Sequence, residues 1–347
     1  MSLILAAVKP SSVLIATDFS QASEKPLRHA LAIARFYGSK FCLAHVVSSP
    51  GLTMAGPSAI AGSEEAASEY AARLQDSLAR TGVLGGIRHK FVIRQGELWP
   101  ELLEIVRQEN ADLIVLGTHG RNGLGKLFFG SVAEQVFRQA GCPVLSFGPR
   151  SCERPWIGDA SGKRTFLFAT DFGDASLHGL PRAIATANEF GAKLVLLHVI
   201  PGAAVPQSMG WHTAEDLSIF REDTRTRTLR RLEALIKNVV LDVQPEFAVE
   251  FSFSRPISES ILQAAEKLRA DLIIMGLHYS VHTGVMSRLG LSTAYEVICD
   301  ADSPVLTVNC STGDSVVRPG PSDAANALLS QADVIRIHGL GVKWSME

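Results

Sequence analysis

Residues 13–20 read VLIATDFS and residues 166–173 read FLFATDFG, so the chain contains this stretch twice. Each copy is a short apolar run followed by Ala-Thr-Asp-Phe, which is typical of a buried strand that ends in a polar turn. A second apolar stretch, ADLI, occurs at residues 111–114 and again at 270–273. The repetition predicts a tandem duplication of one folding unit.

Each unit alternates strands and helices. In the first unit, strands are expected at residues 12–17, 40–47, 89–94, 111–116 and 143–147, and helices at 22–37, 64–80, 99–109 and 131–140. Short strands joined by helices favour a parallel, doubly wound sheet with right-handed crossovers. The fold class is therefore α/β, with two tandem Rossmann-like doubly wound domains, each a five-stranded parallel sheet flanked by helices. We assign residues 8–150 to the first domain, 163–311 to the second and 312–347 to a C-terminal tail.

Composition sets limits on the class of protein. The 347 residues are 46% apolar and 20% charged, as in an ordinary globular protein of about two domains. A net charge of −2 gives no electrostatic reason to expect a nucleic-acid partner or an anionic membrane. The apolar N-terminal residues 3–8 are too few for a signal peptide or a membrane span. The five cysteines form no Cys-x-x-Cys pair, which favours free thiols. These features predict a cytoplasmic protein.

Residues 117–131 read GTHGRNGLGKLFFGS, between a predicted strand and a predicted helix. Glycines allow backbone N–H groups to surround an anion, and a helix N-terminus carries partial positive charge. The loop also contains Arg121 and Lys126, so it is interpreted as a phosphate-binding loop; the alternative is a purely structural turn. Leu127 follows Lys126 where a phosphate loop of the Gly-x4-Gly-Lys-Ser/Thr type has a hydroxyl residue, which argues against a fast nucleotide hydrolase.

The second unit has an altered loop at residues 276–292. Tyr279 stands where the first loop has Gly120, and Leu291 stands where it has Gly130. A bulky ring would obstruct close approach of a phosphate, so the second unit is expected to have lost ordinary nucleotide binding. A metal site is not expected there, because no cysteine or carboxylate lies at ligand spacing from the loop histidines. A rearranged anion-binding site beside Arg288 remains an alternative for this loop.

Three motifs of the first unit resemble those of the universal stress protein family. They are ATDFS at 16–20, His45-Val46, and Gly117-x2-Gly120-x9-Gly130-Ser131. The likeness covers residues 8–150 and, more loosely, 163–310. It implies a tandem universal stress protein, and ATP-binding members of the family hold nucleotide at the carboxyl ends of strands one, two and four.

The resemblance also implies which residues bind ATP, with Mg²⁺ on its phosphates. The adenosine side would be lined by Thr17, Asp18 and the backbone of Val46. The ribose and phosphates would be approached by Gly117, His119, Gly120, Arg121, Gly130, Ser131 and Val132. Asp18 has an alternative role as an N-cap of the following helix. His45 is expected to be packed rather than catalytic, and no catalytic set of residues is recognised.

The expected function is that of an ATP-binding stress-response protein with at most slow hydrolysis. The family resemblance implies an internal pseudodimer in which the final strands, 144–147 and 305–308, pair with each other; a further homodimer is compatible with it. The sequence is compatible with two other functions. One is a nucleotide-independent interaction module that acts through its surface or the tail 312–347. The other is an enzyme that activates a substrate as an adenylate, which ranks last because no separate catalytic motif is present.

Overall fold

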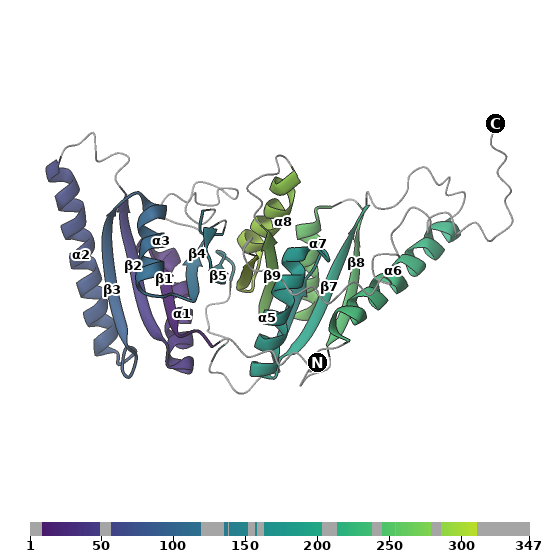
Figure 1. The fold of residues 1–347 in the computed structure, drawn as a ribbon, viewed down its shortest axis with the longest axis horizontal. Coiled ribbons are helices and arrows are strands. Elements are labelled where there is room, and N and C mark those ends of the chain that lie inside the picture. Colours follow the sequence, from purple (N-terminus) through teal and green to yellow (C-terminus); the bar gives the residue numbers. More distant parts are fainter. Residues whose placement is uncertain are drawn as a thin grey trace.

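The structure is a computed structural model. It describes residues 9–48, 57–118, 135–137, 139–151, 157, 163–202, 214–237, 245–253, 255–278 and 286–310. Within these residues the strands form one ten-stranded sheet in the order β3-β2-β1-β4-β5-β10-β9-β6-β7-β8 (Figure 1). The first five strands come from the first repeat and the last five from the second.

The two repeats contain corresponding elements. The first repeat comprises β1 (Ser12–Ala16), the short 3-10 helix η1 (Gln21–Ser23), α1 (Glu24–Tyr37), β2 (Lys40–Ser48), α2 (Pro57–Arg80), β3 (His89–Gly96), α3 (Leu98–Gln108), β4 (Leu113–Gly117) and β5 (Val144–Phe147). The second comprises β6 (Thr165–Ala169), α5 (Asp174–Phe190), β7 (Lys193–Pro201), α6 (Ala214–Ile236), β8 (Glu246–Ser252), α7 (Ile257–Leu268), β9 (Leu272–His278), α8 (Met286–Asp300) and β10 (Val305–Cys310).

The two halves join through their last strands. Strands are parallel within each half, but β5 and β10 are antiparallel, and Leu145 is the register partner of Leu306. The buried Ser146 and Thr307 hydroxyls add bonds across this junction, to the carbonyls of Val305 (3.0 Å) and Val144 (3.2 Å). The expected α/β fold and the pairing of the final strands are thus confirmed, and the two five-stranded sheets form a single mixed sheet.

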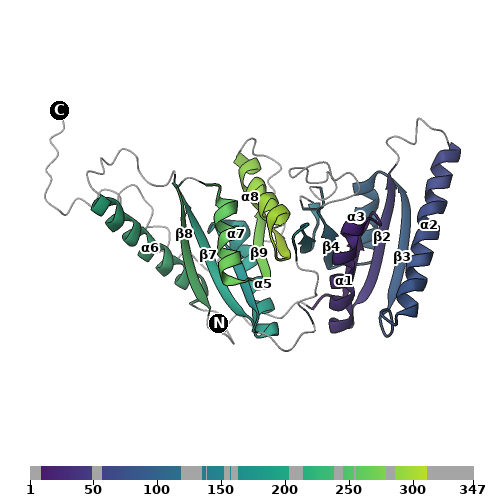
Figure 2. The ribbon, with the colours of Figure 1, turned by 180° about the vertical axis from the view of Figure 1, so that it is seen from behind.

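Alternating side chains of the strands build a core on each face of the sheet. Leu14 and Ile114 point to one face, with the helices α3, α7 and α8, whereas Val13 and Val115 point to the other, with α1, α2, α5 and α6. Each core continues across the junction into the second repeat. Figures 1 and 2 show the long helices α2 and α6 at opposite ends of the molecule, beside the edge strands β3 and β8.

Helix boundaries largely follow the sequence pattern. Gly38 and Gly191 end α1 and α5 in the left-handed conformation, with φ of 67° and 55°, as glycine at a helix C-cap does. The prediction that the second helix begins at residue 64 was wrong, because α2 begins at Pro57. Proline suits the first position of a helix, since its missing N–H would have no intrahelical partner there.

A carboxylate at the end of α3 holds two neighbouring strands of the first repeat. Glu109, whose side chain is only 4% exposed, accepts hydrogen bonds from Lys40 of β2 and from Lys90 of β3, the latter at 2.6 Å. Hydrogen bonds from Lys40 and Lys90 hold the pKa of Glu109 below its ordinary value. The carboxylate therefore stays ionised, and both bonds persist, at neutral pH.

We expect Glu109→Gln to lower the free energy of unfolding by about 2 kcal/mol at pH 7, because two charge-assisted bonds to a buried group are lost. A depressed pKa in the folded state stabilises the protein above the unfolded value and loses this effect as pH falls through the folded value. The difference between wild type and variant should therefore shrink below about pH 4. Urea unfolding at pH 7 and pH 3.5 measures it. Glu104→Gln, at a half-exposed residue of the same helix, is the control; an equal loss in both variants would contradict the prediction.

Candidate functional site

The candidate site lies at the carboxyl ends of β1, β2 and β4. These strands are parallel neighbours in the order β2-β1-β4, and Ala16 is paired with both Ala44 and Leu116. The chain winds outward from β1 through β2 to β3, then returns to place β4 on the other side of β1. The crevice beside such a reversal of strand order is where doubly wound sheets bind ligands.

Thr17 and Asp18 organise the turn that leaves β1. The Asp18 Oδ1 atom accepts hydrogen bonds from the backbone N–H of Ser20 and the hydroxyl of Ser23, both at 2.9 Å. The Thr17 Oγ1 atom accepts one from the N–H of Phe19 at 3.0 Å. Phe19 has a φ of 60°, a strained value for a residue with a side chain. Asp18 therefore has a structural role in this turn, but the prediction that it is an N-cap was wrong, because Ser20 is the N-cap of η1 and Ser23 that of α1.

An aromatic cluster lies beside this turn. The Phe19 ring is 4.5 Å from the His45 ring and 4.6 Å from the ring of Tyr70 on α2, measured between centroids. The Nδ1 atom of His45 lies 2.7 Å from the Thr17 carbonyl oxygen, which can only accept, so Nδ1 carries the hydrogen. His45 is thus a packed residue that fixes the end of β1 to β2. Val46 follows it and is 7% exposed.

Gly117 and Thr118 lie at the carboxyl end of β4, on the other side of β1 from β2. A Cβ atom at Gly117 would lie 3.2 Å from the carbonyl oxygen of Ala22, so the end of β4 runs close to the start of α1. Thr118 is buried and its N–H donates to the Phe147 carbonyl at 3.0 Å, which ties β4 to the end of β5.

Four of the predicted site residues, Thr17, Asp18, Val46 and Gly117, thus lie on the ends of neighbouring strands. The other six, His119, Gly120, Arg121, Gly130, Ser131 and Val132, lie outside the described residues. Phe19 and Tyr70, whose rings pack beside the turn after β1, were not among the predicted site residues. The recurrence of Phe19 as Phe172 in the second repeat was a signal for the first of them, whereas Tyr70 carried none.

The second repeat builds the same turn. Asp171 Oδ1 accepts from the Gly173 N–H at 2.8 Å and from the Ser176 hydroxyl at 2.6 Å. Phe172 has a φ of 62°, and its ring lies 4.6 Å from that of His198. The turn is therefore a property of the duplicated motif and does not depend on an intact glycine-rich loop.

The two repeats differ in what covers this phenylalanine. In the second repeat the Arg231 guanidinium of α6 lies 4.1 Å from the centroid of Phe172, whereas Tyr70 of α2 lies against Phe19 in the first. A guanidinium on a ring face is a favourable cation–π contact. The strand ends of the second repeat are thus bordered by a positive charge in place of a phenol ring.

The backbone also differs between the repeats. Gly276, the counterpart of Gly117, lies so close to α5 that a Cβ atom there would overlap the carbonyl group of Ala175. Gly179 of α5 faces Gly276 directly, since a Cβ on Gly179 would lie 3.3 Å from the Gly276 Cα. Helix α5 therefore rests on β9 more tightly than α1 and η1 rest on β4.

His198 gives the second site a measurable pH dependence. Burial lowers the pKa of His198 below its ordinary value; the bond from Nδ1 to the Thr170 carbonyl (2.8 Å) opposes this shift, and the Arg231 charge adds to it. The unfolded chain takes up a proton near about pH 6.5, whereas the folded ring stays neutral, so the unfolded state binds more protons as the pH falls.

We therefore expect the stability that neutral His198 contributes to be present above about pH 6.5 and to be lost as the pH falls below that value. The His198→Gln variant should lose less stability than wild type between pH 7.5 and 5.5. Urea unfolding at the two pH values measures this difference. Equal losses in the two proteins would show that His198 does not titrate below its ordinary range.

The described residues contain no group of three His, Cys, Asp or Glu side chains that could hold a metal ion. The loop histidines of the second repeat are His278 and His282, and their side chains and that of Arg288 lie outside the described residues. Cys42, Cys142 and Cys299 are free thiols, as expected. Burial raises the pKa of Cys42 and of Cys142 to about 12, so both thiols stay protonated at neutral pH. No helix in the described part of the chain is long and apolar enough to cross a membrane.

Comparison with known proteins agrees with this architecture. A model of the universal stress protein family matches the chain twice, at residues 11–147 and 163–309, so the chain belongs to this family and carries two such domains. The tail 312–347 lies outside both matches, and the domain boundaries given above stay predictions.

Individual relatives match one repeat or both. A universal stress protein of Methanocaldococcus jannaschii is 33% identical over 138 residues, which are 38% of this chain and 79% of that protein. One from Thermus aquaticus is 30% identical over 135 residues, 39% of this chain and 96% of the relative. The crystal structure of a universal stress protein from Archaeoglobus fulgidus superposes with a TM-score of 0.57 and 21% identity, over 86% of this chain and 98% of that one. The tandem arrangement of the fold is therefore shared with a solved structure.

Proposed function

We propose that the first repeat binds ATP, with Mg²⁺ on its phosphates, and that the chain acts as a nucleotide-responsive stress protein of the cytoplasm. The observation that carries this proposal is the crevice at the reversal of strand order, where Asp18 and Gly117 end neighbouring strands. The glycine-rich sequence that follows Gly117 supplies the backbone N–H groups that a phosphate needs.

The residues of the crevice fit an adenine nucleotide. The backbone of Val46 can form hydrogen bonds with the polar edge of a base. The Asp18 carboxylate can accept a hydrogen bond from an N–H or O–H group of the ligand. Gly117 has no side chain, so the chain can pass close to the ligand beside the start of α1. His119, Gly120 and Arg121 would approach the ribose and phosphates.

The phosphates would be held at the start of the following helix by Gly130, Ser131 and Val132. Mg²⁺ would be held mainly by the phosphates and by water, because this ion keeps several waters when it binds a nucleotide.

We propose that the second repeat is silent toward ATP. Arg231 covers the Phe172 ring, and α5 lies against Gly276, so its strand ends differ from those of the first repeat in both charge and shape. The sequence points the same way, because Tyr279 and Leu291 stand where the first repeat has two glycines. Leu291 lies inside α8, which begins at Met286, so the expected loop of residues 276–292 is shorter than predicted.

Calorimetric titration of the nucleotide-stripped full chain with Mg-ATP tests both proposals. We expect one ATP per chain. Two per chain would contradict a silent second repeat. No binding would contradict the nucleotide function and favour the interaction module as the function of this chain. Titration with Mg-AMP alongside separates recognition of adenosine from recognition of the phosphates.

A further inference from the structure

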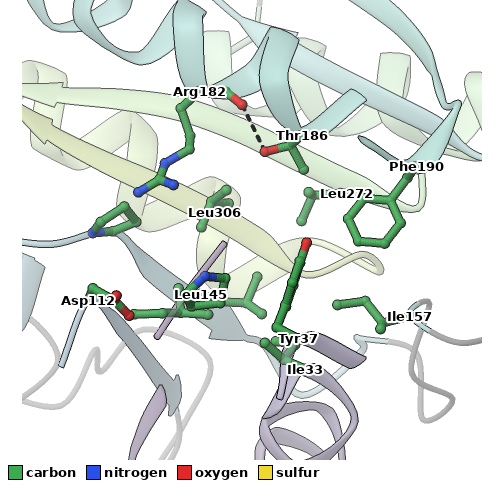
Figure 3. Close-up of a pocket in the computed structure, with 13 residues that line it drawn as sticks. Ile33, Tyr37, Asp112, Leu145, Ile157, Arg182, Thr186, Phe190, Leu272 and Leu306 are labelled. Atoms are coloured by element: carbon green, nitrogen blue, oxygen red, sulfur yellow. Dashed lines mark hydrogen bonds between the residues drawn. The ribbon is translucent and has the colours of Figure 1, made fainter. Parts of the chain in front are cut away.

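A cavity of about 60 Å³ lies where the two repeats meet, between the C-terminal halves of α1 and α5 (Figure 3). Its wall includes Arg182 and Thr186 of α5, and Asp112, which precedes β4. The volume is about twice the ~30 Å³ that a water molecule takes up in the liquid, so there is no room for a ligand such as a nucleotide. The crevice proposed for ATP lies at the carboxyl ends of β1, β2 and β4, so this cavity is a separate place in the molecule.

Three aromatic side chains beside the cavity form a surface that we call the aromatic rim. Phe36 and Tyr37 are the last two residues of α1, and Phe190 is the last residue of α5. The Phe36 ring lies 4.9 Å from the Tyr37 ring and 5.4 Å from the Phe190 ring, measured between centroids. Tyr37 and Phe190 line the cavity, whereas Phe36 is 51% exposed. The aromatic rim is therefore an apolar surface that both repeats build and that is exposed to solvent at Phe36.

Polar contacts hold the rings of the aromatic rim in place. The Tyr37 hydroxyl donates to the Glu189 carboxylate of the other repeat at 2.8 Å. Burial and this hydrogen bond raise the pKa of Tyr37, so the hydroxyl stays protonated and the bond persists at neutral pH. The Arg164 guanidinium lies 5.6 Å from the centroid of the Phe190 ring. A surface whose side chains are already fixed loses little conformational entropy when it is covered.

Pro10 places the beginning of the described chain beside the aromatic rim. It lines the cavity, and its carbonyl accepts a hydrogen bond from the hydroxyl of Ser39, two residues after the end of α1. The next carbonyl, of Ser11, accepts from the Lys40 N–H at 2.8 Å. Residues 1–8 lie outside the described residues, and these bonds fix the point to which they are joined.

Residues 1–8 have the composition that an apolar surface requires. They read MSLILAAV, with six consecutive apolar residues and no charge. Eight residues of extended chain span at most about 28 Å, whereas the rim centroids lie within 6.4 Å of one another. The apolar residues of the tail at 334–337 lie far along the chain from Cys310, where β10 ends. The short connection through Pro10 gives residues 1–8 the higher effective concentration at the aromatic rim.

We propose that residues 3–8 dock on the aromatic rim. The side chains of Leu3, Ile4 and Leu5 would cover the exposed part of Phe36 and the mouth of the cavity, and removal of this apolar surface from water favours the contact. The aromatic rim includes residues of α1 and α5, so the docked segment would join the two repeats at a second place, apart from the pairing of β5 with β10. The proposal does not depend on ATP binding.

Photo-crosslinking in the full chain tests the proposal. Leu5 is replaced by p-benzoylphenylalanine, which keeps an apolar side chain at this position, and mass spectrometry after proteolysis identifies the cross-linked peptides. We expect cross-links within one chain to the peptides that contain the aromatic rim. Saturating Mg-ATP should leave these cross-links in place, so a failed ATP titration and a failed cross-linking experiment are separate outcomes.

Two substitutions in the labelled chain show whether the aromatic rim itself holds the segment. Phe36→Ser should lower the yield of cross-links to the Phe190 peptide at least about twofold, because the docked segment loses an apolar partner. Phe253→Ser is the matched control, since Phe253 is 42% exposed and follows the edge strand β8. This control should give the wild-type yield. Circular dichroism checks that both variants are folded.

The proposal is overturned if cross-links are absent or lie mainly outside the aromatic rim, the tail 312–347 included. Cross-links mainly between two chains would also overturn it, because a second copy would then supply the segment. An unchanged yield in a folded Phe36→Ser protein has the same meaning. Should that variant unfold, Leu3→Ser with Ile4→Ser changes only the segment and should lower the yield too, and full retention would overturn the proposal.

Discussion

Replacing Gly276 by alanine is expected to lower the stability of the second repeat by about 3 kcal/mol or more. The added Cβ would overlap the carbonyl group of Ala175, and that atom belongs to the backbone of α5, so no side-chain rotation can relieve the contact. The helix would have to move away from β9. Movement of α5 would also disturb the junction, because Arg182 and Thr186 lie on the same helix.

The matched variant in the first repeat is Gly117→Ala. Its Cβ would lie 3.2 Å from the Ala22 carbonyl oxygen, which a shift of a few tenths of an ångström relieves, so about 1 kcal/mol is expected. Urea unfolding of the full chain measures the loss of stability in both variants. Hydrogen exchange shows whether the loss caused by Gly276→Ala lies in α5 and β9. Equal destabilisation by the two substitutions would contradict the difference in helix placement.

Gly130→Val is expected to weaken Mg-ATP binding at least tenfold, or ~1.4 kcal/mol. The reason rests on the proposed function: the N–H groups at the start of a helix can reach a phosphate only where no side chain stands between them. Titration calorimetry of the variant measures the loss, and circular dichroism establishes that it is folded.

The duplication again provides a control. Leu291→Val alters the counterpart position of the second repeat, and it should leave both the affinity for ATP and the stoichiometry as in wild type. Unchanged affinity in a folded Gly130→Val protein would remove the glycine-rich loop from the binding site. A loss in both variants would mean that both repeats take part.

The architecture could be predicted from the sequence because its signals are local and occur twice. The apolar run at residues 13–16 predicts a strand from neighbouring residues alone. Gly38 likewise predicts where the next helix ends. The start of α2 was misjudged, since Pro57 stands in a run with Gly and Ser that also suits a loop. The pairing of β5 with β10 came from the family resemblance, because nothing in two four-residue apolar runs specifies a partner.

The details of the site depended on contacts between distant residues. Tyr70 of α2 packs against Phe19, and Arg231 of α6 packs against Phe172, yet α2 and α6 share little sequence that would align these residues. Gly117 and Gly276 are the same residue in the same motif, and only the backbone shows how differently the helices approach them. The cavity where the two repeats meet, between Tyr37 of α1 and Phe190 of α5, could not be predicted from the sequence either, since its lining comes from both halves of the chain.

The antiparallel contact between β5 and β10 has a consequence for how the protein behaves in a cell. Two separate halves that met through these strands would come apart on dilution, and the extent of assembly would follow the amount of protein present. In this chain the halves are covalently linked, so the junction forms at the same level however few molecules are made. A response that begins when expression is still low could thus rely on a fully assembled ten-stranded sheet from the first copy onward.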